Sequence, residues 1–161
     1  MSTLASFYGF VLGIHVLAVV AAFGVTFAYP IMFSVAARHG AHSLPLLHRI
    51  EYTLARYLIN PGLLLVLIAG AYLASDGHRW SEFFVQWGLG AVIVIGALVG
   101  SVMIPTSKRA EGIAHRDITA SGHGDPEMSE DYRALVRRLS TVGSALSGLV
   151  VITILIMAVK P

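Results

Sequence analysis

The chain has 161 residues, of which 56% belong to the hydrophobic set and only 12% are charged. Soluble domains carry about 45–50% apolar and about 25% charged residues, and a domain of this size has too much surface to hide such an excess. The composition excludes an ordinary soluble enzyme, a disordered chain and a nucleic-acid-binding module of the usual kind. The absence of cysteine excludes disulfides, thiolate metal sites, iron–sulfur clusters and covalently attached c-type haem.

Four long stretches of the sequence contain no Asp, Glu, Lys or Arg. They cover residues 1–37, 57–75, 83–107 and 139–159. A helix needs about 20 mostly apolar residues to cross the hydrocarbon core, and the alternation typical of barrel strands is absent here. A soluble bundle would need a charged stripe along each helix, which these stretches lack. The sequence therefore predicts an all-α, up-down-up-down bundle of four transmembrane helices, forming one integral membrane domain.

The helix boundaries follow from caps and breakers. The expected helices cover residues 4–38, 44–75, 81–107 with an extension left open, and 126–159, with a cytoplasmic connection over 108–138. The first stretch is too long for one straight span, and Pro30 predicts a kink because it cannot donate to the carbonyl of Thr26. Ser43 and Asp125 are expected to cap the second and fourth helices, and Pro105 to mark the end of the third span.

The basic residues predict the orientation. Nine of the eleven Lys and Arg residues lie in or beside the first and third connections. The positive-inside rule then places these connections in the cytoplasm and both termini outside, in the inner membrane. The lipid bilayer is the expected partner.

Small residues recur at four-residue spacing within the spans, as in the pairs Gly9/Gly13 and Gly96/Gly100. In lipid, such residues let helix backbones approach closely. Packing within the chain is the main interpretation, and a homo-oligomer or a larger membrane complex is the alternative.

His15 is the ionisable residue that lies deepest in an apolar span, tyrosines aside. Tyr8, Thr26 and Tyr29 fall with it in a sector about 60° wide at 100° per residue. Such a buried imidazole could ligate haem iron or copper, relay protons, or form a structural hydrogen bond. A single deep histidine disfavours a bis-histidine haem within one subunit. A haem with His15 as its main ligand, or a site shared across a dimer, stays open.

A second candidate cluster lies at the cytoplasmic edge. His39, His42, His48 and Glu51 are close in sequence, and imidazole with carboxylate suits Zn, Cu or Fe. The alternative is that these are solvated loop side chains. On the second helix Arg56 belongs to a polar face that either snorkels to the interface or clamps a carboxylate or phosphate, such as a porphyrin propionate or a lipid headgroup.

A first-span histidine followed by a glycine, here His15 and Gly24, resembles the signature of a bacterial family of predicted integral membrane proteins of unknown function. That family is distantly similar to the copper-resistance D membrane domain and to the HemJ-type protoporphyrinogen oxidases. The resemblance implies a four-helix membrane protein and carries no established reaction. Three functions remain: a haem- or metal-binding redox protein using His15 with haem b or copper, a non-catalytic assembly subunit, and a small transporter.

Overall fold

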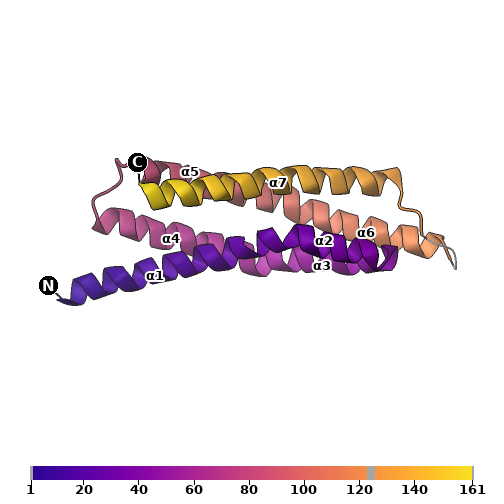
Figure 1. Ribbon diagram of the computed structural model, residues 1–161, viewed down its shortest axis with the longest axis horizontal. Helices are drawn as coiled ribbons and strands as arrows, with labels where there is room; N and C mark the ends of the chain where they lie inside the picture. Colours follow the sequence, from indigo (N-terminus) through magenta and orange to yellow (C-terminus); the bar gives the residue numbers. More distant parts are fainter. Residues whose placement is uncertain (1, 123–125, 161) are drawn as a thin grey trace.

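The computed structural model describes residues 2–122 and 126–160, with side chains for all of these except residues 2–6 and 37. The described residues form helices, turns and short connections, with no strand among them. The α-helices are α1 (Ser2–Gly24), α2 (Tyr29–Arg38), α3 (Leu44–Leu54), α4 (Asn60–Asp76), α5 (Phe83–Leu98), α6 (Ile104–Ala120) and α7 (Glu130–Val159). They run back and forth along one elongated bundle (Figure 1). The predicted all-α bundle is confirmed.

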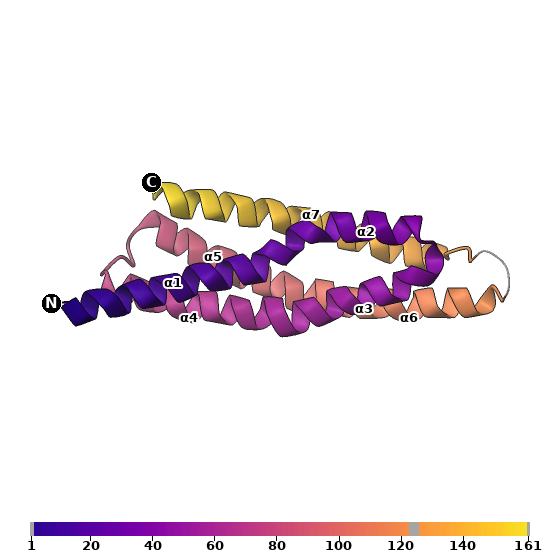
Figure 2. The same ribbon diagram turned by 60° about the horizontal axis from the view of Figure 1, so that its bottom comes forward.

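The seven α-helices combine into four long rods, because α1 continues into α2, α3 into α4, and α5 into α6 (Figure 2). In the described part of the chain, four helices are long and apolar enough to cross a membrane: Phe7–Ala36, Ala41–Asp76, Phe83–Ala120 and Glu130–Val159. The start of α1 and the end of α7 lie at the same end of the bundle in both views. These features are those of a multi-pass membrane protein with an even number of spans.

A proline follows the break in each of the three jointed rods. Pro30 follows a 3-10 turn, and Pro61 and Pro105 follow π-helical turns. Proline has no N–H to bond the carbonyl four residues earlier, and its ring crowds that carbonyl, so the preceding turn tightens or widens. The turns cover Val25–Ala28, Ala55–Ile59 and Val99–Met103. The predicted kink near Pro30 is confirmed.

Beyond Pro105 the third rod continues, in line with the extension left open for the helix over residues 81–107. The chain stays helical through Ala120, so much of the expected connection 108–138 is helix. The fourth rod begins at Glu130, where the hydroxyl of Ser129 accepts a hydrogen bond from the Tyr132 backbone N–H. The expected cap Asp125 lies outside the described residues.

The first connection also differs from its prediction in one detail. Ser43 makes no side-chain cap and instead donates its hydroxyl to the carbonyl of Ala36, at 2.8 Å. This bond ties the start of α3 back to the end of α2. Gly40 between them has a φ of +89°, which explains why glycine stands at this reversal.

A close approach between two rods joins α1 and α4. A Cβ atom placed on Gly62 would lie 2.7 Å from the Cβ of Ala22, which is fully buried. Around this point Phe23, Leu63 and Ile95 form part of the main apolar core. By contrast, a Cβ on Gly9 or Gly13 would meet nothing within 4 Å. Among these three glycines, it is therefore Gly62 that allows two helices of the chain to pack closely.

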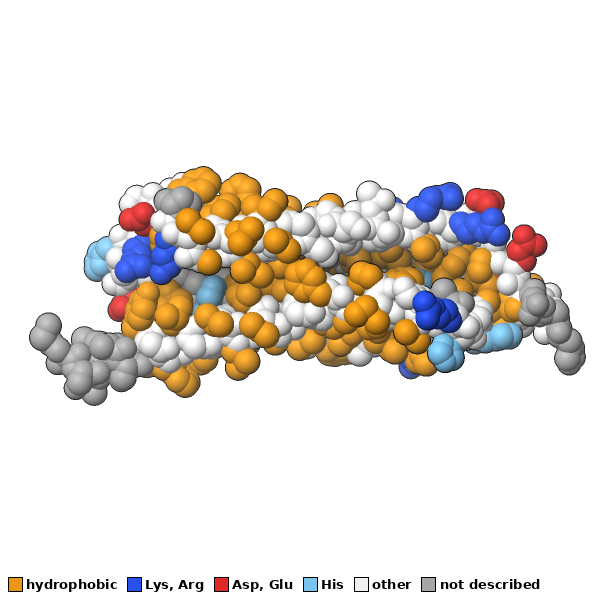
Figure 3. All heavy atoms as spheres, viewed as in Figure 1, with side chains coloured by type: hydrophobic (Ala, Val, Ile, Leu, Met, Phe, Trp, Pro, Cys, Tyr) orange, Lys and Arg blue, Asp and Glu red, His pale blue; other side chains and the backbone are white. Residues whose placement is uncertain are grey.

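The surface of the bundle changes character along its length. Large apolar side chains point outward in the half built by α1, α4, α5 and the end of α7; Leu17 and Leu155 are 67% and 59% exposed. Figure 3 shows acidic and basic side chains gathered toward the two ends of the visible face, with hydrophobic side chains between them. An apolar band of this kind is stable only when lipid covers it.

Candidate functional site

The first candidate site is formed by His15 on α1 and the backbone of α4. The Nδ1 atom of His15 lies 3.1 Å from the carbonyl oxygen of Val66. Because a carbonyl can only accept, Nδ1 carries the proton and donates, which leaves a lone pair on Nε2. One turn further along α4, a Cβ on Gly70 would lie 3.2 Å from Cε1 of His15. The imidazole therefore lies against the space that Gly70 leaves open.

This contact lies at the middle of the apolar band. Val66 is ten residues from Arg56 and ten from Asp76, the charged residues that bound the apolar part of its rod. At about 1.5 Å per residue, the Val66 carbonyl is about 15 Å from each border, the centre of a hydrocarbon core about 30 Å thick. No hydrogen bond from the described residues reaches Nε2 of His15. At this depth water cannot supply the missing partner.

The other residues predicted to share a site with His15 are spread along the bundle. Tyr8 and Tyr29 are 21 positions apart, about 32 Å along a helix, so a shared face does not bring them together. Thr26 donates its hydroxyl to the carbonyl of Phe23, at 2.6 Å, within its own turn. Arg56 is exposed in the π-helical turn before α4.

A second, polar cluster joins α3 to α7. His48 is fully buried, and its Nδ1–H donates to Oε2 of Glu51 at 2.8 Å. On the other side of the ring, the Tyr132 hydroxyl lies 2.8 Å from Nε2. Because the carboxylate can only accept, Nδ1 carries the proton of the first bond, and Nε2 shares the second bond with the phenol. We call Glu51, His48 and Tyr132 the polar triad.

The surroundings keep the polar triad dry and hold the phenol in its protonated form. Glu51 and Tyr132 are 4% and 5% exposed, and Phe33 of α2 packs its ring edge-on against His48, with 5.7 Å between centroids. The triad lies beyond the apolar part of the rods. Burial, and secondarily the charge of Glu51, raise the pKa of Tyr132 to about 12. The triad therefore holds α2, α3 and α7 together.

The structure brings together two of the four residues predicted as metal ligands. His48 and Glu51 are in contact, whereas His39 and His42 are exposed. The Nδ1–H of His39 donates to the carbonyl of Val35, at 2.9 Å. Among residues 2–122 and 126–160, no three His, Asp or Glu side chains lie close enough to hold one metal ion.

Sequence reasoning missed Tyr132, which lies 84 positions from its partner His48. Its helix carries a usable signal, because Tyr132, Leu135 and Leu139 follow the three- and four-residue spacing of one buried face. That pattern predicts a buried tyrosine without naming the residue that receives its hydroxyl.

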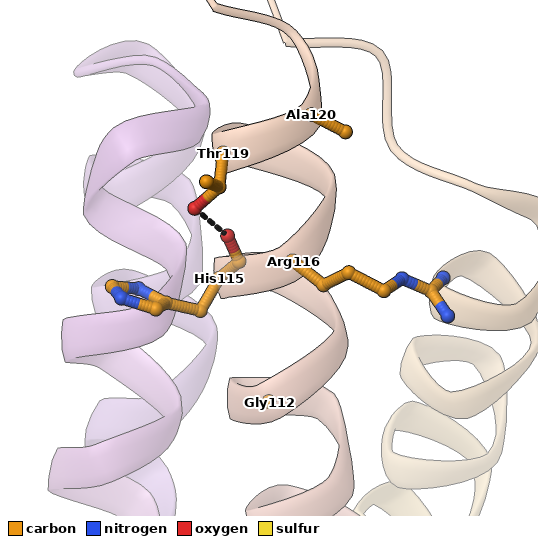
Figure 4. A pocket seen from close by; sticks show the side chains of 5 residues that line it. All are labelled: Gly112, His115, Arg116, Thr119 and Ala120. Atoms are coloured by element: carbon orange, nitrogen blue, oxygen red, sulfur yellow. Dashed lines mark hydrogen bonds between the residues drawn. The ribbon is translucent and has the colours of Figure 1, made fainter.

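A groove on α6 is lined by Gly112, His115, Arg116, Thr119 and Ala120 (Figure 4). His115 points toward the α2–α3 side and Arg116 toward the α7 side, so their polar groups do not converge. Arg116 instead binds the adjacent Asp117, at 2.9 Å. The groove therefore offers a surface and no convergent set of polar groups.

Asp117 ties α6 to the start of α7. Its Oδ2 atom accepts the backbone N–H of Ser129 at 2.9 Å. Hydrogen bonds from Ser129, with a smaller contribution from Arg116, hold the pKa of this carboxyl below its ordinary value. Asp117 lies ten residues past the uncharged part of its rod, outside the membrane-spanning segment.

Comparison with known proteins finds no match to any family model, curated protein or solved structure. The fold defines the class as a four-span, multi-pass membrane protein. The candidate groups for its chemistry are His15 and the polar triad.

Proposed function

We propose that this is an inner-membrane protein that binds a metal-centred redox cofactor through Nε2 of His15. The observation that carries the proposal is the hydrogen bond from Nδ1 to the Val66 carbonyl at the centre of the apolar band. Histidines that bind metals almost always donate their other ring N–H to a carbonyl, carboxylate or water, which fixes the tautomer and makes the ligand more basic. His15 has this arrangement.

Haem b fits these surroundings better than a copper ion. Copper would require further nitrogen or sulfur ligands, and His15 belongs to no group of three His, Asp or Glu side chains among the described residues. Haem requires one strong axial nitrogen and otherwise apolar contacts. When bound, haem supplies one-electron chemistry. The chain itself would contribute the lone pair of Nε2, the tautomer set by Val66, and the room that Gly70 leaves for the imidazole ring.

The same geometry supports a second candidate function, that of an assembly subunit. An imidazole nitrogen without a partner in hydrocarbon would also accept a hydrogen bond from a donor on a neighbouring subunit. In that case the occupant of Nε2 is a protein group and no redox cofactor is needed. A haem shared between two copies of this chain combines both ideas.

The proposed orientation places the α2–α3 and α6–α7 connections in the cytoplasm and both termini outside. It rests on the nine of eleven Lys and Arg residues in or beside those connections. The start of α1 and the end of α7 lie at the opposite end of the bundle.

The absorption spectrum of the protein purified from haem-replete membranes tests the proposal. We expect a Soret band with near-stoichiometric iron, lost in His15→Ala and weakened in Gly70→Leu, which fills the space beside the imidazole. His115→Ala is the matched control, because His115 is exposed on α6, and its spectrum should equal that of the wild type. A wild type with neither a Soret band nor bound metal would refute the cofactor. A partner protein that then co-purifies with the wild type and not with His15→Ala would favour the assembly role.

A further inference from the structure

Four of the exposed cations at the end of the bundle opposite the start of α1 lie on three of the rods. They are Arg56 in the π-helical turn before α4, Lys108 and Arg109 on α6, and Arg138 on α7. None of the four has a carboxylate of the described residues within 4.0 Å, whereas Arg116, Arg133 and Arg137 each have at least one. We call Arg56, Lys108, Arg109 and Arg138 the basic collar.

Packing places the members of the basic collar at one level of the bundle. Ala110 and Leu139 belong to the same buried cluster, so their sequence neighbours Arg109 and Arg138 lie at the same height. Ala55, which precedes Arg56, belongs to the adjoining cluster, against which Ile104 packs. Lys108 follows Ile104 by one turn. The four cations therefore lie within about two helical turns of each other along the bundle axis, about 11 Å.

This level is the border of the apolar band. The uncharged stretch 57–75 begins directly after Arg56, the stretch 83–107 ends directly before Lys108, and the stretch 139–159 begins directly after Arg138. Cations at the ends of a membrane-spanning helix extend toward the interface, where the phosphate groups of the lipids lie. The basic collar is therefore placed at the height of the headgroups.

Acidic side chains at this end of the molecule lie further from the membrane. Glu130 in the first turn of α7 pairs with Arg133 at 3.2 Å, and Asp117 pairs with Arg116 at 2.9 Å. Glu111 lies three residues from Lys108, and no ion pair joins them. The opposite border carries two exposed carboxylates, Asp76 and Glu82, and two exposed cations, Arg79 and Lys160. The formal charges of Asp76, Glu82, Arg79 and Lys160 thus balance at the opposite border, whereas the border with the basic collar is strongly positive.

We propose that the basic collar binds the phosphate groups of anionic phospholipids of the phosphatidylglycerol class. This inference is independent of the cofactor at His15. Guanidinium and ammonium groups donate charge-assisted hydrogen bonds to phosphate, and an anionic leaflet attracts each Lys or Arg near its surface. Arg56, Arg109 and Arg138 present guanidinium groups from different rods, so one lipid headgroup can bridge two rods.

Native mass spectrometry of the protein released from mixed vesicles of phosphatidylglycerol and phosphatidylcholine tests this. We expect retention of phosphatidylglycerol over phosphatidylcholine, with a preference that falls roughly five-fold for each collar cation changed to glutamine. High salt during equilibration should weaken the preference of the wild type, because these charges are exposed. The matched control is Arg133→Gln with Arg137→Gln, which removes cations of the same end that already have carboxylate partners.

Three outcomes would overturn the proposal: equal retention of both lipids by the wild type, an unchanged preference in the collar variants, or an equal loss in the control pair. A preference abolished by inorganic phosphate at equal phosphate concentration would assign the collar to a soluble anion, and would also contradict it. Should the four-fold glutamine variant fail to fold, the double variant Arg56→Gln with Arg138→Gln and the salt dependence of the wild type decide the question.

Discussion

The hydroxyl of Tyr132 and Nε2 of His48 lie 2.8 Å apart, although the two residues are 84 positions apart in the chain. Glu51 holds the other side of the same ring. This contact fastens the first turn of α7 to α3 at a place where neither water nor a charged surface residue can substitute. It makes the polar triad a fixed joint between rods that meet elsewhere mainly through apolar packing.

Removal of the phenol should therefore cost stability. We expect Tyr132→Phe to lower the free energy of unfolding by about 1–3 kcal/mol, because it leaves Nε2 of a buried imidazole without a partner. Unfolding in mixed detergent micelles, followed by circular dichroism, measures the change. Tyr57→Phe serves as the control, since Tyr57 is 71% exposed and should tolerate the loss of its hydroxyl. Equal stability of Tyr132→Phe and wild type would mean that the triad is not a joint.

The contact between α1 and α4 predicts a sharp difference between two glycines. Gly62→Ala places a methyl group 2.7 Å from the Cβ of Ala22 and should force the backbones apart, at a cost of about 1–3 kcal/mol. Gly90→Ala is its counterpart in α5, where a Cβ meets nothing within 4 Å, and it should leave stability unchanged or raise it slightly. Thermal unfolding of both variants in the same detergent makes the comparison. Similar loss in both would contradict the close approach.

The stability that the contact between α6 and α7 contributes should depend on pH. The pKa of Asp117 is lower in the folded protein than its ordinary value of 3.8. Its contribution to stability is thus complete above that ordinary value and is lost as the pH falls through the lowered one. Unfolding followed over an acid pH series should show a smaller loss in Asp117→Asn than in the wild type. Parallel pH profiles of the two proteins would rule out this role.

The cap at the same join gives a separate prediction. Ser129→Ala removes the hydroxyl that accepts the Tyr132 backbone N–H at 3.4 Å. Loss of an N-cap costs about 0.5–2 kcal/mol, whereas Ser129→Asn should retain most of the stability because asparagine also caps helices well and adds no charge beside Asp117. Chemical unfolding of the two variants side by side provides the measurement. A loss in Ser129→Asn as large as in Ser129→Ala would show that capping is not what this position contributes.

The number of spans and the kink at Pro30 could be predicted from the sequence, because charge-free length and the missing proline N–H act locally. The extension past Pro105 stayed open, since a proline that ends a helix and one that widens it into a π turn share the same local sequence. The extension through Ala120 is decided by tertiary packing, in which Ala110 and Ala114 are fully buried beside Tyr132.

In the candidate sites, too, local features could be predicted from the sequence and tertiary contacts could not. The depth of His15 followed from its position in a charge-free stretch, but its partner is a backbone carbonyl of Val66, which no side-chain pattern reveals. Tyr8, Thr26 and Tyr29 share a helix face with His15, but they do not form one site with it. A helical wheel shows only the direction of each side chain and ignores the distance between residues along the helix axis. His48 and Glu51 could be paired from their spacing of three residues, whereas Tyr132 required knowledge of which rods pack together.

Cysteine accessibility tests most directly that lipid covers the apolar band and that His15 lies inside it. The natural chain contains no cysteine, so each introduced thiol reports alone. Leu17 lies two residues from His15, and its side chain is 67% exposed in the bare protein. In intact membrane vesicles, His78→Cys and Thr119→Cys should react with a membrane-impermeant maleimide from opposite sides, and Leu17→Cys should remain unlabelled until detergent is added. Rapid labelling of Leu17→Cys in sealed vesicles, or labelling of the other two from the same side, would contradict the four-span arrangement.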